Sequence, residues 1–302
     1  MTRRSRRLLL LTAAVAVLAG CTGGGAGVAA TASSPSPVLS PPPALRLDPF
    51  YARYLDAGGI PIVASARVPE AALERARGLV LAMLAARPDL RAELVREGAR
   101  VGIIAADEAI TDLPEHRGWT RPAKDDPRLT ACERKRYAEI AAMSDRDYWN
   151  ARARGNGGLF TTVGAENLLA TPGGRYFGET ILVHEFAHAI LDAVARADPA
   201  LHRAIEAAYA RARAERLWEG DYASVTVQEY WAEGTQFWFN DNMLARLDRA
   251  NVVSDRDLAR YDPPLAAALA RAYGRRHRLP GDPFYRHPAR LAVPAGYRSA
   301  DC

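Results

Sequence analysis

The sequence has little lysine and little excess charge. Only two of its 40 basic residues are lysines, and the formal net charge is +5. Arg3, Arg4, Arg6 and Arg7 supply four of these positive charges, and residues 1–20 contain no acidic residue. Because we expect this leader to be cleaved, the mature chain keeps a net charge of 5 − 4 = +1. Such a chain has no basic stripe to follow a phosphate backbone, so a nucleic-acid partner is not expected.

The leader also lacks a hydrophobic run long enough to cross a bilayer, which needs about 20 apolar residues. Its run from Leu8 to Leu18 follows an arginine-rich start, as in a secretory signal peptide. The run ends in Leu18-Ala19-Gly20-Cys21, which resembles the bacterial lipobox, where small residues precede an acylated cysteine. We therefore expect residues 1–20 to be a signal peptide and Cys21 to carry a lipid. The lipid would anchor an exported chain to the outer face of the bacterial cell membrane. The alternative is an ordinary signal peptide with an incidental cysteine.

Cysteine is scarce as well, with three residues in the whole chain. Apart from Cys21, only Cys132 and Cys302 are present, and neither has a second cysteine or a histidine at metal-ligand spacing nearby. This spacing disfavours a thiol metal site. Because an exported compartment permits disulfides, we expect a Cys132–Cys302 bond that holds the C-terminus against the domain. Two free thiols are the alternative.

The composition predicts a tether followed by one folded domain. Residues 21–45 are rich first in glycine and then in serine and proline. Such a segment cannot bury enough apolar surface to fold, so it should act as a spacer. The chain as a whole is 49% hydrophobic and 25% charged, which is ordinary for a globular protein. We expect residues 46–302 to form the catalytic domain.

Hydrophobic periodicity predicts an α+β fold, with a small mixed sheet in the N-terminal half and mostly helices later. Short apolar runs at 60–63, 101–105 and 159–163 are typical of strands. Helical patterns follow, and the three that bear on the site cover residues 179–195, 199–217 and 227–247.

The first of these helices contains the pattern His184-Glu185-Phe186-Ala187-His188. Residues four apart lie on one helix face, so both imidazoles can reach a single ion, and neutral imidazoles suit Zn²⁺. The adjacent Glu185 can act as a general base on a water molecule held by that ion. The surrounding helix is apolar on nearly every side, which indicates burial and makes unpaired histidines costly. A pair of hydrogen-bonded core histidines is the alternative.

A catalytic zinc site usually takes a third protein ligand. Leu191 and Val194 occupy the places where a metzincin motif would continue with glycine and histidine, so that pattern is excluded. A glutamate on a following helix is the other common solution, and Glu229 and Glu233 are one turn apart among aromatic residues. One carboxylate could bind the ion while the other accepts a hydrogen bond from a ligating imidazole. A solvated helix face is the alternative.

The motif with Glu185, then Tyr222, Glu229 and Glu233, resembles the catalytic domain of the anthrax lethal factor family, a group of gluzincin zinc peptidases. The resemblance covers roughly residues 176–240 and implies a zincin-like fold with one Zn²⁺. It further implies Glu229 as the third ligand beside the two histidines, Glu233 as the support of a ligating histidine, and Tyr222 as the donor to the oxyanion. No counterpart of the toxin's receptor-binding and docking parts is found, so its host targets are not implied.

These features predict a zinc metallopeptidase that hydrolyses a peptide or protein substrate outside the cytoplasm, with Glu185 as its base. In zincins an edge strand above the site pairs with the substrate backbone, and segment 155–164 is our candidate for that strand. A glycine-rich turn before a structural strand is the alternative for this segment. Two other functions remain open: a non-catalytic zinc lipoprotein that binds peptide or cell-wall material, and a zinc hydrolase of another amide.

Overall fold

The computed structural model describes residues 37–127, 129, 131–294 and 299. The signal peptide, most of the tether and the lipidation of Cys21 lie outside these residues, and so does the predicted partner of Cys132, Cys302. In the described part of the chain, no helix is long and apolar enough to cross a membrane.

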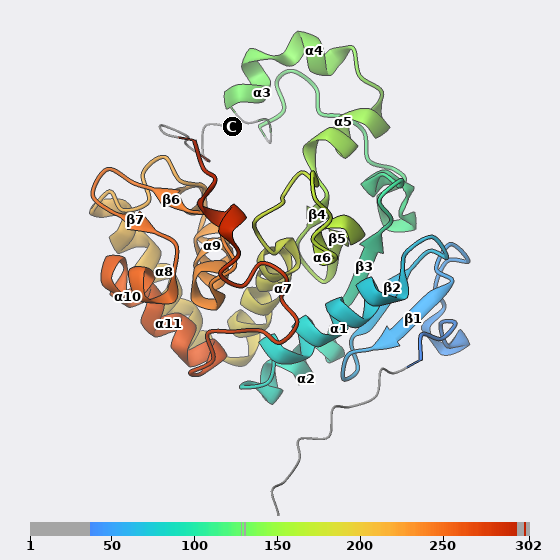
Figure 1. Cartoon of the computed structure of the whole chain (residues 1–302), viewed down its shortest axis with the longest axis horizontal. Coiled ribbons are helices and arrows are strands. Elements are labelled where there is room, and N and C mark those ends of the chain that lie inside the picture. Colours follow the sequence, from blue (N-terminus) through green and yellow to red (C-terminus); the bar gives the residue numbers. More distant parts are fainter. Residues whose placement is uncertain (1–36, 128, 130, 295–298, 300–302) are drawn as a thin grey trace, which may run out of the picture. The chain divides into compact units, whose positions relative to one another are not determined.

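A five-stranded mixed sheet forms the first part of the fold (Figure 1). Its strand order is β1-β2-β3-β5-β4. The strands are β1 (Arg53–Asp56), β2 (Pro61–Ala64), β3 (Arg100–Ile104), β4 (Gly155–Asn156) and β5 (Phe160–Gly164). The three central strands run parallel, while β1 and β4 are antiparallel edges. Parallel strands are covered on both faces, which is why β2 and β3 are continuous apolar runs in the sequence.

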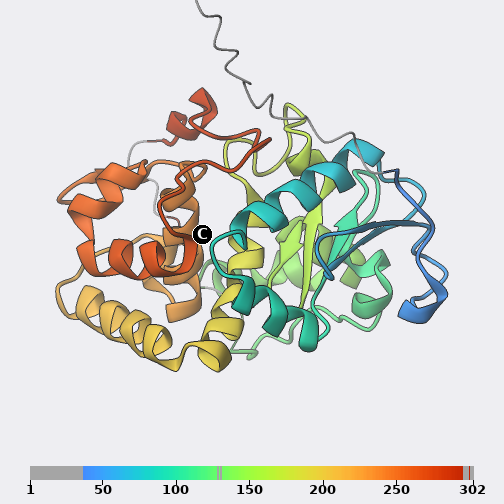
Figure 2. The same cartoon turned by 90° about the horizontal axis from the view of Figure 1, so that it is seen from below.

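Helices cover the sheet and connect it to the second part of the fold. α1 (Glu70–Met83) contacts β1 and β2, and α7 (Ile181–Ala197) contacts β5 (Figure 2). α2 (Pro88–Arg96) packs on α7. Three short helices lie between β3 and β4 in the chain: α3 (Ala131–Lys135), α4 (Tyr137–Ala141) and α5 (Asp145–Arg152). A fourth, α6 (Ala165–Leu168), lies between β5 and α7.

The second part of the fold is mostly helical (Figure 1). It contains α8 (Pro199–Ala214), α9 (Val227–Phe239), α10 (Asp255–Tyr261), α11 (Pro263–Tyr273) and a two-stranded sheet of β6 (Ala245–Arg246) and β7 (Asn251–Val252). Over the described residues, eleven α-helices and two sheets therefore make a mixed α+β protein, as the sequence predicted. The largest buried cluster is continuous from the sheet through α7 to α9 and α11, so both parts share one core.

One predicted helix is too long. The pattern at 227–247 predicts a single helix, but α9 ends at Phe239 and residues 245–246 form strand β6. Asn240 adopts a left-handed conformation with φ of 63°, which an α-helix cannot continue through. Beyond this point Ala245 is buried and Met243, Leu244 and Leu247 are partly buried by tertiary contacts, so their spacing was mistaken for helical periodicity.

Candidate metal centre

Helix α7 places His184 and His188 on the same face, four residues apart. His184 is 8% exposed and His188 is partly buried. The first turn of the helix is held by a buried asparagine, because Asn167 Oδ1 accepts a hydrogen bond from the Ile181 amide at 2.9 Å. This bond satisfies one of the amide groups that a helix start leaves without a partner. The histidines are therefore carried by a helix whose beginning is fixed in place.

Helix α9 brings the carboxylate of Glu229 to the two histidines. The helix begins at a threonine cap, where Thr226 Oγ1 accepts from the Glu229 amide at 3.1 Å. Glu229 Oε2 lies 3.0 Å from His184 Nε2 and 3.6 Å from His188 Nε2. A hydrogen bond also links α9 to α7: Trp231 Nε1 donates to the Ala187 carbonyl at 3.1 Å.

The three predicted ligands fit a divalent cation. All of their ligand atoms lie within 4.8 Å of one another. A tetrahedral ion with bonds of about 2.0–2.1 Å would hold such atoms about 3.3–3.4 Å apart. The two distances from Glu229, 3.0 and 3.6 Å, lie on either side of that value. Two imidazoles and one carboxylate are also a common donor set for a transition metal.

The side chains of His184 and Glu229 pair directly with each other. Burial lowers the pKa of His184, but hydrogen bonds with Glu229 and Glu233 outweigh it and hold that pKa well above 6.5. Burial and the charge on His184 lower the pKa of His188 to about 4. Burial raises the pKa of Glu229, but the hydrogen bond with His184 brings it below its ordinary value. A bound cation would take the place of the proton on His184.

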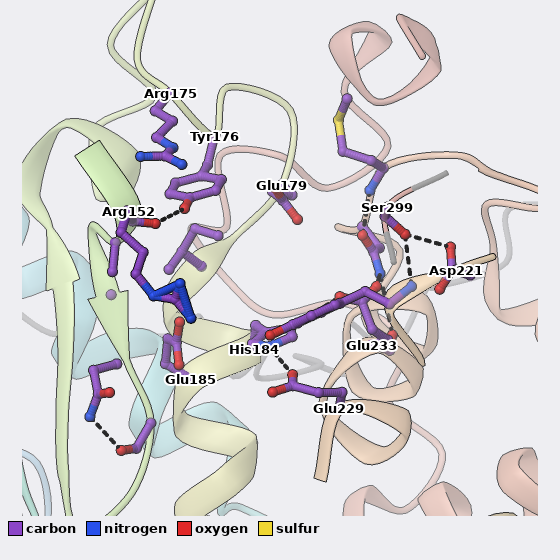
Figure 3. A pocket seen from close by; sticks show the side chains of 18 of the residues that line it. Arg152, Arg175, Tyr176, Glu179, His184, Glu185, Asp221, Glu229, Glu233 and Ser299 are labelled. Carbon is purple, nitrogen blue, oxygen red and sulfur yellow. Dashed lines mark hydrogen bonds and ion pairs between the residues drawn. The ribbon is translucent and has the colours of Figure 1, made fainter. Parts of the chain in front are cut away.

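Glu185 lies in the same cleft, beside the edge of the sheet (Figure 3). Burial, together with the charges of Glu229 and Glu233, raises its pKa to about 7. Burial and Glu233 likewise raise the pKa of Glu179, which lines the cleft, to about 7. The carboxyl groups of Glu179, Glu185, Glu229 and Glu233 thus share one partly buried space with the two imidazoles. A divalent cation would offset this concentration of negative charge.

Two side chains, rather than the single carboxylate expected, contact the Nδ1 side of the His184 imidazole. His184 Nδ1 lies 3.0 Å from Gln236 Oε1 and 3.4 Å from Glu233 Oε1. Asn242 Nδ2 donates to the other oxygen of Glu233 at 2.6 Å. Glu233 therefore lies near the imidazole, and the sequence analysis missed Gln236. Its signal was its position two turns after Glu229 and about one turn after Glu233, on the same helix face.

Tyr222 is also brought to the cleft. It begins the short 3₁₀ helix η4 (Tyr222–Ser224), and its ring centroid lies 6.3 Å from that of His184, with the planes 22° apart. The Tyr222 side chain is 38% exposed, and the Tyr222 amide donates to Ser299 Oγ at 2.7 Å. The tyrosine is therefore at the rim of the cleft, on the side of α9.

The edge strand of the sheet is shorter than predicted. Within segment 155–164, β5 pairs with β3 along its whole length and with β4 at Thr162 and Val163, so the predicted free edge is wrong at these two residues, where β4 forms the edge instead. Strand β4 lies against α7. A Cβ on Gly155 would be 3.0 Å from Glu185 Oε1, and one on Gly157 would be 2.8 Å from His188 Cβ. These glycines permit the close approach of the strand to the histidine helix.

Two adjacent residues of α6 form the hydrogen bonds that fix the segment before β4 and the loop before α7. Glu166 accepts from Arg154 Nε at 2.7 Å and Nη2 at 2.9 Å, which fixes the chain just before β4. Asn167 Nδ2 donates to the carbonyls of Tyr176 at 3.1 Å and Glu179 at 2.9 Å, which fixes the loop before α7. The sequence analysis did not find these residues. Nothing in their local pattern distinguishes them from surface polar residues.

The cleft has a volume of about 1090 Å³ (Figure 3). Its lining includes the apolar side chains of Ile140, Met143, Leu244 and Val293 as well as the three metal-ligand residues. A space of this size is at the upper end of the range of ligand-binding pockets.

Comparison of the chain with protein-family models, with curated proteins and with solved structures gives no match. The geometry defines a class: a mixed α+β protein whose described part holds one group, His184, His188 and Glu229, that could bind a metal ion.

Proposed function

We propose that the chain is a zinc-dependent metallopeptidase of the gluzincin type with a zincin-like fold. The observation that carries this proposal is the group of His184, His188 and Glu229 with Glu185 beside it in an open cleft. A site used only for structure would need a fourth protein ligand and would have no use for a base. When bound, the zinc ion would polarise a carbonyl group and lower the pKa of water.

The residues of the chain supply the proton transfers. Glu185 can take a proton from water as its oxygen adds to the carbonyl carbon. Glu185 then gives that proton to the amide nitrogen as the C–N bond breaks, and an acid and an amine are released. The hydroxyl of Tyr222 is the candidate donor to the oxyanion. Gln236 and Glu233 hold His184 in its orientation.

The open edge of the sheet supports a polymeric substrate. The outer side of β4 has no partner strand among the described residues, and the strand passes next to Glu185. An extended backbone could add to this edge by hydrogen bonds that do not depend on sequence. Such pairing would present a peptide carbonyl beside the base.

A matched pair of variants tests the reaction. The purified chain is loaded with Zn²⁺, its metal content is measured, and hydrolysis of casein and of a quenched fluorescent peptide library is followed. Glu185→Gln should keep the metal and lose roughly 100- to 10,000-fold in kcat/KM, the usual contribution of a general base. The control Glu74→Gln, on an exposed helix face, should match the parent. Equal activity in the parent and in Glu185→Gln, with zinc bound to both, would refute the proposal.

We further propose that the enzyme acts outside the cytoplasm, held to the membrane by a lipid on Cys21. The sequence Leu18-Ala19-Gly20-Cys21 and the spacer that follows it support this location. Cys21→Ala should abolish incorporation of a labelled fatty acid and release the chain from membranes. A variant that still takes up the label would contradict the anchor.

A further inference from the structure

Two further acidic residues, Asp241 and Asp282, lie together outside the metal centre. Asp241 follows the end of α9 and is 0% exposed. Its carboxyl group is within hydrogen-bonding reach of Asp282, in the loop after α11. Asp282 Oδ1 accepts from Thr180 Oγ1 at 2.6 Å and from the Phe284 amide at 2.9 Å. Among the described residues, no N–H or O–H donor reaches Asp282 Oδ2 or either oxygen of Asp241.

Three buried carboxylate oxygens without a donor are costly for the folded state. A buried ionised carboxylate normally requires a paired charge or several hydrogen bonds. The position of Asp241 adds to this cost, because the C-terminal end of a helix such as α9 carries partial negative charge. A proton shared between the two carboxyl groups would make one hydrogen bond and leave one oxygen of Asp241 without a partner. A cation between them could contact all three oxygens.

The surrounding charges also fit a divalent ion. The groups that act on Asp241 include the negative Asp282 and Glu179 and the positive Arg290. With all four ionised, their charges sum to −3 + 1 = −2, which one divalent cation would neutralise. Arg290 does not bond to either aspartate. Its guanidinium instead donates to the carbonyls of Asn242, at 2.6 Å, and Val253.

We propose that Asp241 and Asp282 form a second cation site, for a hard divalent ion such as Ca²⁺. The available donors are all oxygens, which hard cations prefer and zinc does not, and water or backbone carbonyls would complete the coordination. The site would link the end of α9 to the start of α7, because Asp282 is bonded to Thr180, the residue before that helix. The ion would therefore brace the two helices that carry the metal centre without taking part in the reaction.

Calcium binding by the purified full chain tests this site. The protein is stripped with a chelator, Ca²⁺ is titrated by calorimetry, and thermal unfolding is followed with and without Ca²⁺. We expect one Ca²⁺ per chain and a rise in Tm of several degrees. Glu229→Gln, which removes a ligand of the other metal centre, should keep the full Ca²⁺ effect. Asp282→Asn and Asp241→Asn should both lose it.

Two results would overturn the inference. One is a parent protein that binds no Ca²⁺ and shows no change in Tm, which would indicate a proton shared between the aspartates. The other is Ca²⁺ binding that persists in both aspartate variants, which would locate the ion elsewhere. Calorimetry on the parent protein tests for Ca²⁺ binding even if the aspartate variants fold poorly. The result is also independent of peptidase activity, so it cannot be confused with failure of the proposed function.

Discussion

Removal of Glu229 should weaken metal binding more than removal of any other carboxylate in the cleft. Its Oε2 is the only carboxylate oxygen within 4 Å of both His184 Nε2 and His188 Nε2 in the described structure. Glu233 and Gln236 instead face the other nitrogen of His184. Loss of a residue that supports a ligand typically lowers metal affinity roughly 10- to 100-fold, or about 1.4–2.7 kcal/mol at about 1.36 kcal/mol per tenfold.

We therefore expect Glu233→Ala and Gln236→Ala each to lose metal affinity within that range, and Glu229→Ala to lose more than about 100-fold. Zinc affinity would be measured by competition with a chromophoric chelator at fixed pH, because protons compete for the imidazoles. Circular dichroism of the metal-free variants checks that the helices are intact. If Glu233→Ala lost more metal than Glu229→Ala while both remained folded, the assignment of the third ligand would be reversed.

Three further predictions concern the support of the site. Gly157→Ala places a Cβ 2.8 Å from His188 Cβ, so it should lower the free energy of unfolding by about 1–3 kcal/mol and weaken metal binding. The control is Gly118→Ala, whose added Cβ has no atom within 4 Å and which should be nearly neutral. Both are measured by denaturant unfolding. Thr226→Ala removes the cap of α9 and should cost about 0.5–2 kcal/mol, checked by the same unfolding curves. With metal removed by a chelator, protonation of Glu185 stabilises the folded chain, because its pKa is raised to about 7 on folding. This contribution to the free energy of unfolding is complete below about pH 4.5 and is lost as the pH rises through about 7. Glu185→Gln should flatten that part of a plot of Tm against pH, and an unchanged slope would contradict the raised pKa.

The local pattern of the sequence was enough to find the two histidines and the pair of glutamates, while the choice of Glu229 as the ligand came from the family resemblance. His184 and His188 are four residues apart on an apolar helix, and that spacing alone puts them on one face. Glu229 and Glu233 repeat the same spacing on a second helix. Gln236 shares that face but was overlooked, because an amide is not a usual metal ligand and its role depends on the position of His184.

The neighbours of the site could not be predicted in this way. The approach of Gly157 to His188 joins residues from a sheet edge and a helix, and no periodicity in either segment reports it. The pair of Arg154 and Glu166 looks in the sequence like two ordinary charged residues, yet it fixes the start of the edge strand. Asn167 likewise becomes informative only when its three backbone partners are known.

The sequence by itself determined the elements with strong periodicity, the order of sheet before helices, and the residue types able to hold a metal ion, because these depend on contacts within a turn or two of chain. The tertiary structure decided where α9 ends, which strand is the sheet edge, and which aspartates are buried together. Those outcomes depend on contacts such as that between Thr180 and Asp282, 102 residues apart, whose energies appear only when the chain is folded.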